Sequence, residues 1–126
     1  MGSVIAGYSR SPFTRAMKGE LARTRPDDIA ATVKPDDAHC AISRLLCLEN
    51  TVNGRIQTAE HLSNLCAAAR RHNLYCHLDG ARLMNAAVAS NMQANAFTAS
   101  FDSVSLCLSK GLAAPVGSVL VGNKAF

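Results

Sequence analysis

The chain alternates between short apolar runs and longer segments that have the periodicity of a helix. Residues 45–48 form a continuous apolar run bounded by polar residues, which predicts a strand covered on both faces. Thr58 is placed to cap a helix that continues to Arg71, and Asn73 is suited to a left-handed stop. The apolar positions of that helix recur every three or four residues and predict its buried face: Leu62, Leu65, Cys66 and Ala69.

The same rules predict the remaining elements. A first helix begins around residues 24–28, with Thr24 as its capping hydroxyl and Pro26 in its first turn, and Pro35 ends it. The other predicted elements are strands at residues 4–6, 74–78, 103–108 and 117–121 and helices at residues 83–89 and 94–99. Strands that alternate with helices need crossover connections, so we expect an α/β fold with a mostly parallel sheet and helices on both faces.

Length and composition narrow the class of protein. With 126 residues the chain has the length of about one domain. Its 48% hydrophobic and 17% charged residues argue against a disordered chain. No stretch approaches the ~18 consecutive apolar residues that cross a bilayer. Because the start also lacks the pattern of a secretory signal peptide, we expect no membrane partner and a cytoplasmic location.

The charged residues and the cysteines exclude two further kinds of site. Of the net charge of +4, three units come from Arg10, Arg15 and Lys18, a segment without acidic residues. Such a start occurs in targeting segments and nucleic-acid-binding arms, but Phe13 is the one aromatic residue between its basic residues, fewer than a stacking surface for a single strand requires. We therefore interpret it as the solvated edge of a larger fold, with no nucleic-acid partner. The five cysteines include no CxxC pair, so we expect neither a disulfide framework nor a metal site.

Polar residues follow three of the predicted strands. Open parallel sheets bind ligands beyond the carboxyl ends of their strands, and these ends carry Glu49-Asn50, Asp79 and Lys110. A lysine that forms a Schiff base and a carboxylate that pairs with a protonated pyridine nitrogen are what pyridoxal phosphate requires of a protein. Glu49 and Asn50 either line the same crevice or satisfy turn amides. His77 shares a strand face with Asp79 and is expected to be a packed histidine near this site rather than a metal ligand. The other histidines are expected at the surface: His39, His61 and His72.

Three stretches of the sequence resemble one known family. They read CLENT at residues 47–51, HLDGARLMNAAVA at residues 77–89 and FDSVSLCLSKGLAAPVGS at residues 101–118. In order and separation they are similar to motifs of the L-threonine and L-allo-threonine aldolases, which belong to the aspartate-aminotransferase-like, fold type I pyridoxal-phosphate enzymes. The resemblance extends from about Arg25 to the end of the chain.

The resemblance implies a role for three side chains. Lys110 would be the Schiff-base lysine, Asp79 the partner of the pyridine nitrogen, and Arg82 the ligand of the substrate α-carboxylate, for which a planar, always charged guanidinium is suited. The structural alternatives are a solvated turn lysine, a helix N-cap and a surface arginine. The implied reaction is the retro-aldol cleavage of L-threonine or L-allo-threonine to glycine and acetaldehyde. The family also implies a homo-oligomer, either a dimer or a tetramer.

The sequence departs from the family pattern at two positions. Val52 stands where the family has a histidine after Glu-Asn-Thr, and a valine can neither accept nor relay a proton. Ala113 replaces a glycine after the lysine. We expect that change to be benign, because alanine is strained there only if the backbone has a positive φ.

The resemblance also implies how the chain relates to a whole domain. Residues 1–126 would be part of the large pyridoxal-phosphate-binding domain, without the N-terminal segment that carries the phosphate-binding loop and without the small C-terminal domain. Two alternatives stay open beside an active aldolase. One is a truncated, non-catalytic remnant of the same fold, and the other is a different pyridoxal-phosphate-dependent β-eliminating lyase.

Overall fold

The described part of the chain consists of four strands and four helices. The computed structural model describes residues 24–123, so the strand expected at residues 4–6 lies outside it. The strands are β1 (Leu45–Glu49), β2 (Tyr75–Asp79), β3 (Ser103–Cys107) and β4 (Ser118–Gly122). The helices are α1 (Pro26–Thr32), α2 (Ala59–Arg71), α3 (Leu83–Ala89) and α4 (Ala94–Thr98). Every element predicted within this part is present at nearly the predicted bounds.

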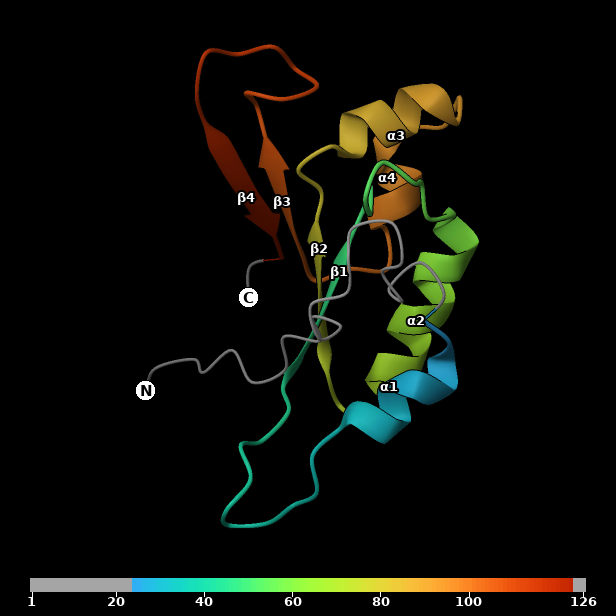
Figure 1. The fold of residues 1–126 in the computed structure, drawn as a ribbon, viewed down its shortest axis with the longest axis vertical. Coiled ribbons are helices and arrows are strands. Elements are labelled where there is room, and N and C mark those ends of the chain that lie inside the picture. The colour runs from blue at the N-terminus through green and yellow to red at the C-terminus, as the bar shows by residue number, and fades with distance from the viewer. Residues whose placement is uncertain (1–23, 124–126) are drawn as a thin grey trace.

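The strands form a single sheet in the order β1-β2-β3-β4 (Figure 1). β1, β2 and β3 are parallel, and the chain crosses between them through α2 and then through α3 and α4. β4 is antiparallel to β3, because a loop over residues 108–117 turns the chain back instead of a helix that would cross the sheet. The α/β fold and the mostly parallel sheet are therefore confirmed.

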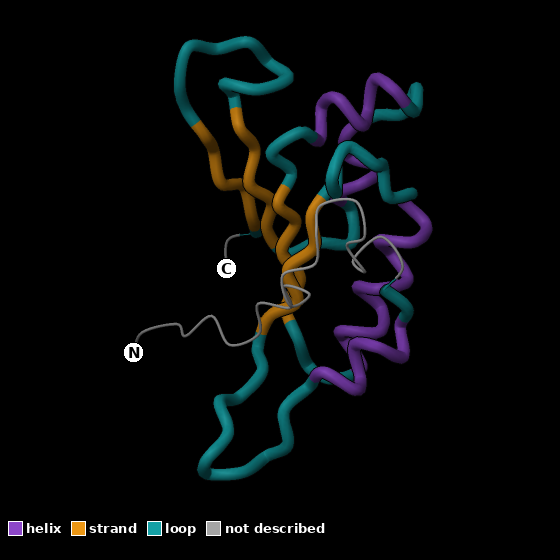
Figure 2. The backbone as a smooth tube through the Cα atoms, viewed as in Figure 1, coloured by secondary structure: helices purple, strands orange, loops and turns teal. Residues whose placement is uncertain are grey.

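The described helices lie on one side of the sheet (Figures 1 and 2). Strand residues alternate between two faces, and the face toward the helices is apolar, with Cys76 and Leu78 fully buried. Leu62 and Leu65 of α2 belong to the same core, so the predicted apolar stripe of α2 is buried as expected. In residues 24–123 helices cover this face alone, in contrast to the expected two. The opposite strand face carries mostly polar side chains, which range from exposed to buried: Cys47, Glu49, His77, Asp79, Ser103 and Ser105.

Local sequence rules account for the ends of α1 and α2, the helices that precede β1 and β2 in the chain. The Thr58 side chain accepts a hydrogen bond from His61 N at 3.1 Å, and Asn73 has a φ of 57° after α2, as predicted. α1 differs from the prediction, because its N-cap is Arg25 rather than Thr24. Asp28 replaces the capping hydroxyl, since its Oδ2 accepts a hydrogen bond from Arg25 N at 2.7 Å. Within residues 24–123 no helix is long and apolar enough to cross a membrane.

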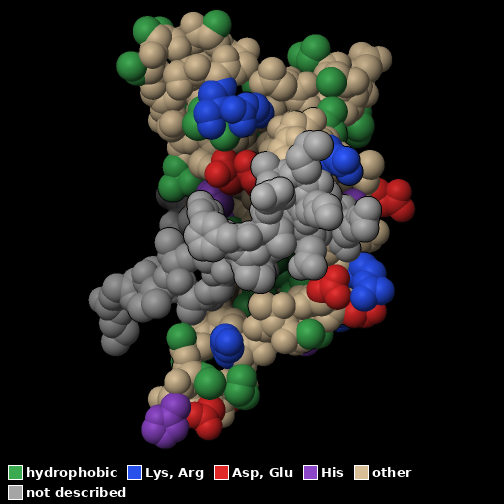
Figure 3. Space-filling model, in the orientation of Figure 1, with side chains coloured by type: hydrophobic (Ala, Val, Ile, Leu, Met, Phe, Trp, Pro, Cys, Tyr) green, Lys and Arg blue, Asp and Glu red, His purple; other side chains and the backbone are tan. Residues whose placement is uncertain are grey.

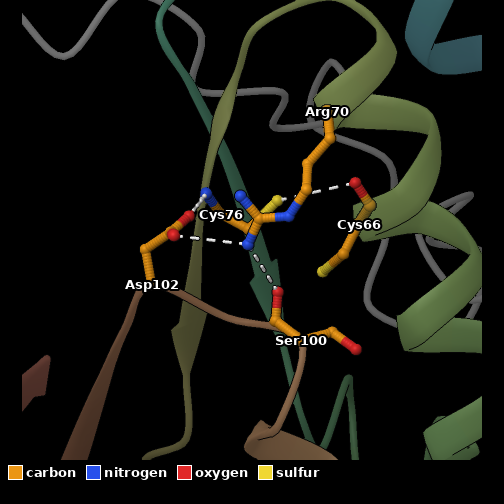
Figure 4. A network of polar contacts seen from close by, with 5 residues as sticks. All are labelled: Cys66, Arg70, Cys76, Ser100 and Asp102. Atoms are coloured by element: carbon orange, nitrogen blue, oxygen red, sulfur yellow. Dashed lines mark hydrogen bonds and ion pairs between the residues drawn. The ribbon is translucent and has the colours of Figure 1, made fainter. Parts of the chain in front are cut away.

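A network of polar contacts ties the amino end of β3 to α2 and β2 (Figure 4). Arg70 Nη2 donates to Asp102 Oδ1 at 3.2 Å and to Ser100 O at 3.1 Å. The other carboxylate oxygen of Asp102 accepts from Cys76 N at 2.7 Å, and Asp102 N donates to Cys76 O at 2.9 Å. The hydrogen bond to this carboxylate raises the pKa of Arg70. The network therefore helps to fix the register of β3 against β2. It lies at the end of the sheet opposite to the predicted site.

Candidate active site

Asp79 is the last residue of β2, at the carboxyl edge of the sheet. In the register of the sheet it is paired with Glu49 of β1 and with Ser105 of β3. Its Oδ1 accepts a hydrogen bond from Ala81 N at 3.0 Å, which fixes the carboxylate against the turn that leads into α3. The side chain is exposed. The structure thus places an accessible and oriented carboxylate where the sequence predicts one.

Gly80 brings the turn after Asp79 into close contact with β3. Its N–H donates to Ser105 O at 2.9 Å. A Cβ at residue 80 would lie 3.0 Å from the same carbonyl oxygen and 3.2 Å from Leu83 Cβ, so a side chain would push the turn away from the sheet. The Asp-Gly sequence therefore holds the carboxylate on a closely packed strand end.

Lys110 lies in the loop between β3 and β4, beyond the carboxyl end of β3. Its side chain is exposed, and its carbonyl oxygen accepts a hydrogen bond from Ala113 N at 3.2 Å. The next residue, Gly111, packs against α3, because a Cβ there would collide with Asn85 Oδ1. Among the described residues no hydrogen bond or ion pair joins Lys110 to Asp79. The two residues nevertheless follow the carboxyl ends of neighbouring parallel strands, and Figure 3 shows Lys or Arg side chains next to Asp or Glu side chains in this upper part of the molecule.

Arg82 occupies the N-cap position of α3, three residues after Asp79. Its carbonyl oxygen accepts hydrogen bonds from Asn85 N at 3.0 Å and from Ala86 N at 3.2 Å. The guanidinium makes no cap hydrogen bond, is exposed, and forms no ion pair within residues 24–123. The backbone of Arg82 therefore begins the helix, while its charge is available at the same edge as Asp79.

Asn50 supports the loop that follows β1. Its side chain is fully buried, its Oδ1 accepts from Gln57 N at 3.0 Å, and its Nδ2 donates to Gln57 O at 3.2 Å. Gln57 Nε2 in turn donates to Glu49 O at 2.6 Å. Of the two roles left open for Asn50, the structure shows the one that satisfies turn amides.

The segment between Asn50 and Gln57 is a tight hairpin. Asn53 and Gly54 both have positive φ, at 49° and 77°, and Val52 and Arg55 exchange two backbone hydrogen bonds across them. Val52 itself is 4% exposed. The valine that departs from the family pattern is thus a buried apolar contact in a well-formed turn.

Ala113 has a φ of 56°, in the left-handed region. The expectation that alanine is benign at this position is therefore wrong. A Cβ in this region approaches the following carbonyl oxygen, a contact that glycine avoids. The loop over residues 108–117 reverses the direction of the chain between β3 and β4. The backbone of residue 113 therefore keeps its positive φ despite the alanine.

Three of the four histidines fulfil their expectations. His77 is a half-buried strand histidine on the same face as Asp79, with its Nδ1 2.7 Å from Ser103 Oγ, and His39 and His72 are exposed. The surface prediction for His61 is wrong. The side chain is half-buried, and its Nε2 is enclosed and has no hydrogen-bond partner among the described residues. Within residues 24–123 no three His, Cys, Asp or Glu residues are grouped so that they could hold a metal ion.

Sequence reasoning missed two residues that shape this edge. Ser103 is hydrogen-bonded to His77, and Asn85 packs against Gly111 in the loop that carries Lys110. The alternation of Ser103 and Ser105 along β3 indicated a polar face, but the pairing of Ser103 with His77 depends on the strand register. The contact of Asn85 depends on the path of a loop, for which the sequence holds no periodic pattern.

A family model described as beta-eliminating lyase matches residues 3–126. The chain belongs to the beta-eliminating lyase family. Members of this family that resemble it are known from bacteria and fungi. The low specificity L-threonine aldolase of Escherichia coli K12 is 43% identical over 122 residues, which is 97% of this chain and 36% of that protein. The low specificity L-threonine aldolase of Saccharomyces cerevisiae is 44% identical over 102 residues, 79% of this chain and 26% of that protein.

The structural comparison agrees with the family. The solved structure of the Leishmania major threonine aldolase superposes with a TM-score of 0.67 at 24% identity, over 81% of this chain and 31% of that one. The chain therefore has the same fold as part of that structure, with a mostly parallel sheet and helices. The chain spans about a third of the length of the relatives that it matches.

Proposed function

We propose that the chain is the part of a pyridoxal-phosphate-dependent aldehyde-lyase that holds the reactive lysine, and that the substrates are β-hydroxy-α-amino acids. The reaction is the cleavage of L-threonine or L-allo-threonine to glycine and acetaldehyde. The observation that carries the proposal is the placement of Asp79 and Lys110 after the carboxyl ends of neighbouring parallel strands. Support comes from the 43% identity to a low specificity L-threonine aldolase.

The residues at this edge fit the proposed cofactor. Asp79 offers an exposed carboxylate with one oxygen fixed by Ala81 N, which suits a partner for a protonated ring nitrogen. Lys110 offers an exposed amine for a covalent bond to an aldehyde carbon. When bound, pyridoxal phosphate supplies a ring that withdraws electrons from the substrate Cα. The donor set on this edge is therefore one acid and one amine, as this cofactor requires.

Two further residues bear on the substrate. One would bind its carboxylate, and the other restricts which group can accept the proton of its β-hydroxyl. Arg82 is an always charged donor fork, and we assign it to the α-carboxylate of the amino acid. Val52 is buried and apolar, so it excludes water and cannot take the proton of the β-hydroxyl. In this proposal that proton goes to a group other than residue 52.

Reduction with borohydride tests the assignment of Lys110. We expect pyridoxal phosphate, trapped by borohydride on the protein, to be found by peptide mass spectrometry on the fragment that contains Lys110. Lys110→Ala is expected to abolish this adduct and the visible absorption of the bound cofactor. Lys34→Ala is the matched control, because Lys34 is also exposed but lies after α1, away from this edge. An adduct that persists in Lys110→Ala would contradict the assignment.

Product analysis tests the reaction class. We expect threonine to give glycine and acetaldehyde in equal amounts. An oxo acid and ammonia would instead indicate the β-elimination for which the family is named. A protein that binds the cofactor but releases neither pair of products would be the non-catalytic alternative.

A further inference from the structure

A hydrogen-bonded pair of side chains stands behind Asp79 on the polar face of the sheet. His77 precedes Asp79 by two residues on β2, so both side chains lie on the same face. The register places Ser103 of β3 beside His77, and Ser103 Oγ is 2.7 Å from His77 Nδ1. The proposed function assigns no role to His77 or Ser103.

Burial increases along this face from Asp79 to Ser103. Asp79 is exposed, His77 is half-buried, and Ser103 is only 1% exposed. Burial lowers the pKa of His77, whereas the negative charge of Asp79 raises it. Because burial is the larger cause, the net effect lowers the pKa of His77 and favours the neutral imidazole. The short contact with Ser103 holds this neutral ring in one orientation.

The other groups that face the imidazole come from the neighbouring strands. Cys47 of β1 is paired with His77, and burial raises the pKa of its thiol, so this side chain is uncharged. Glu49 lies two residue pairs further along β1, beside Asp79. Among the described residues, Asp79 is the charged group whose field acts on the ring.

We propose that Ser103 and His77 are positioning residues for Asp79: the hydroxyl orients the imidazole on the same strand face as the carboxylate, so that the ring does not compete as a second cation with a cationic ring nitrogen for Asp79. The nature of that ligand rests on the proposed function. An imidazolium at residue 77 would attract the same carboxylate and compete with the ligand. Because linked equilibria are reciprocal, protonation of His77 and binding of a cation at Asp79 oppose each other.

The first experiment follows the histidine rings by ¹⁵N NMR as a function of pH in the protein without ligand. We expect the midpoint of His77 to lie below the ordinary pKa of a histidine. Asp79→Asn removes the anion that raises the pKa of His77, so the midpoint is expected to fall further. Because Asp79 is exposed, this variant is expected to fold.

The role of the hydroxyl is tested in the same titration. Ser103→Ala removes a bond to the neutral ring, so we expect the midpoint of His77 to rise toward its ordinary value. Ser105→Ala is the matched control on the same face of β3 and is expected to leave the midpoint unchanged. A midpoint that responds to neither Asp79→Asn nor Ser103→Ala overturns the proposal, and should Ser103→Ala fail to fold, Asp79→Asn alone decides.

The second experiment measures the dissociation constant of pyridoxal phosphate by its visible absorption. The titrations are made at about pH 8 and at a pH below the His77 midpoint found by NMR, so that they compare the neutral and the protonated ring. We expect the wild-type affinity to fall between them by about three- to tenfold more than that of His77→Gln. Equal pH dependence in the two proteins overturns the proposal. Absence of binding in both contradicts the proposed function instead, and the NMR titration then decides whether the pair acts on Asp79.

Discussion

At residue 113 the backbone takes a conformation that alanine adopts only at a cost. With φ at 56°, the backbone of Ala113 is in the left-handed region, where a Cβ is strained. We expect Ala113→Gly to raise the free energy of unfolding by about 0.5–1 kcal/mol, because glycine relieves this contact. Urea denaturation measures the change. Ala114→Gly is the control, and it is expected to lower the stability, because glycine there only adds freedom to the unfolded chain. The same sign for both variants would contradict the strain.

Single residues were predictable where the rule that governs them is local. Thr58 and Asn73 could be placed at the two ends of α2, because capping and left-handed stops depend on residues within one turn. Ala113 could not be judged, because its φ follows from the path of a loop between two paired strands. His61 has the polar character of a surface residue, yet its Nε2 is enclosed in the folded chain, which no local pattern indicates.

At the scale of elements, Asp102 joins a strand to a helix and to the neighbouring strand. We expect Asp102→Ala to lower the free energy of unfolding by about 2–3 kcal/mol, because Cys76 N loses a charged acceptor at 2.7 Å in a part-buried place. Chemical denaturation measures this loss.

Arg70→Ala separates the two contacts of that carboxylate. Arg70 is half exposed, so its ion pair with Asp102 is screened by water, and we expect its removal to cost about 1 kcal/mol or less. A larger loss for Arg70→Ala than for Asp102→Ala would show that the ion pair, rather than the bond to the strand, holds β3 in place.

The elements themselves were predictable because their apolar patterns are short and regular. Residues 45–48 and the stripe of α2 gave β1 and its first covering helix nearly at their observed bounds. The direction of β4 was not specified, since a strand has the same pattern in either direction. The register, which brings His77 beside Ser103, depends on contacts between distant segments, such as the bond of Asp102 to Cys76, and no single segment encodes it.

At the scale of the whole molecule, β4 leaves an apolar edge open. Leu120 is 66% exposed and Val121 55% exposed, and within residues 24–123 β4 pairs with β3 alone. We expect the 126-residue chain to associate with rising concentration in sedimentation experiments. Leu120→Lys is expected to weaken this association about tenfold, because the charge must be desolvated at the contact.

A second exposed valine controls for a general effect of added charge. Val88 of α3 is 80% exposed and lies on the other side of the molecule from β4 (Figure 1). Val88→Lys is expected to leave the association unchanged. An equal effect of the two lysine variants would show that the chain associates through net charge rather than through β4. The homo-oligomer and the cytoplasmic location stay predictions.

The candidate site was predictable in its residues and less so in its geometry. The end of β2 could be located from the apolar run before Asp79, and Lys110 from the motif that follows β3. The support that surrounds them, namely the contact of Gly111 with Asn85 and the close approach of Gly80 to β3, comes from backbone packing. Such contacts leave no pattern in the sequence other than the glycines themselves.

The two hydrogen bonds between the Asn50 side chain and the Gln57 backbone have a consequence for protein engineering. These bonds join the two ends of the hairpin after β1 without the side chain of residue 52. That residue is therefore a natural site for a directed-evolution library, in which histidine and other side chains replace Val52 while the surrounding scaffold is left untouched.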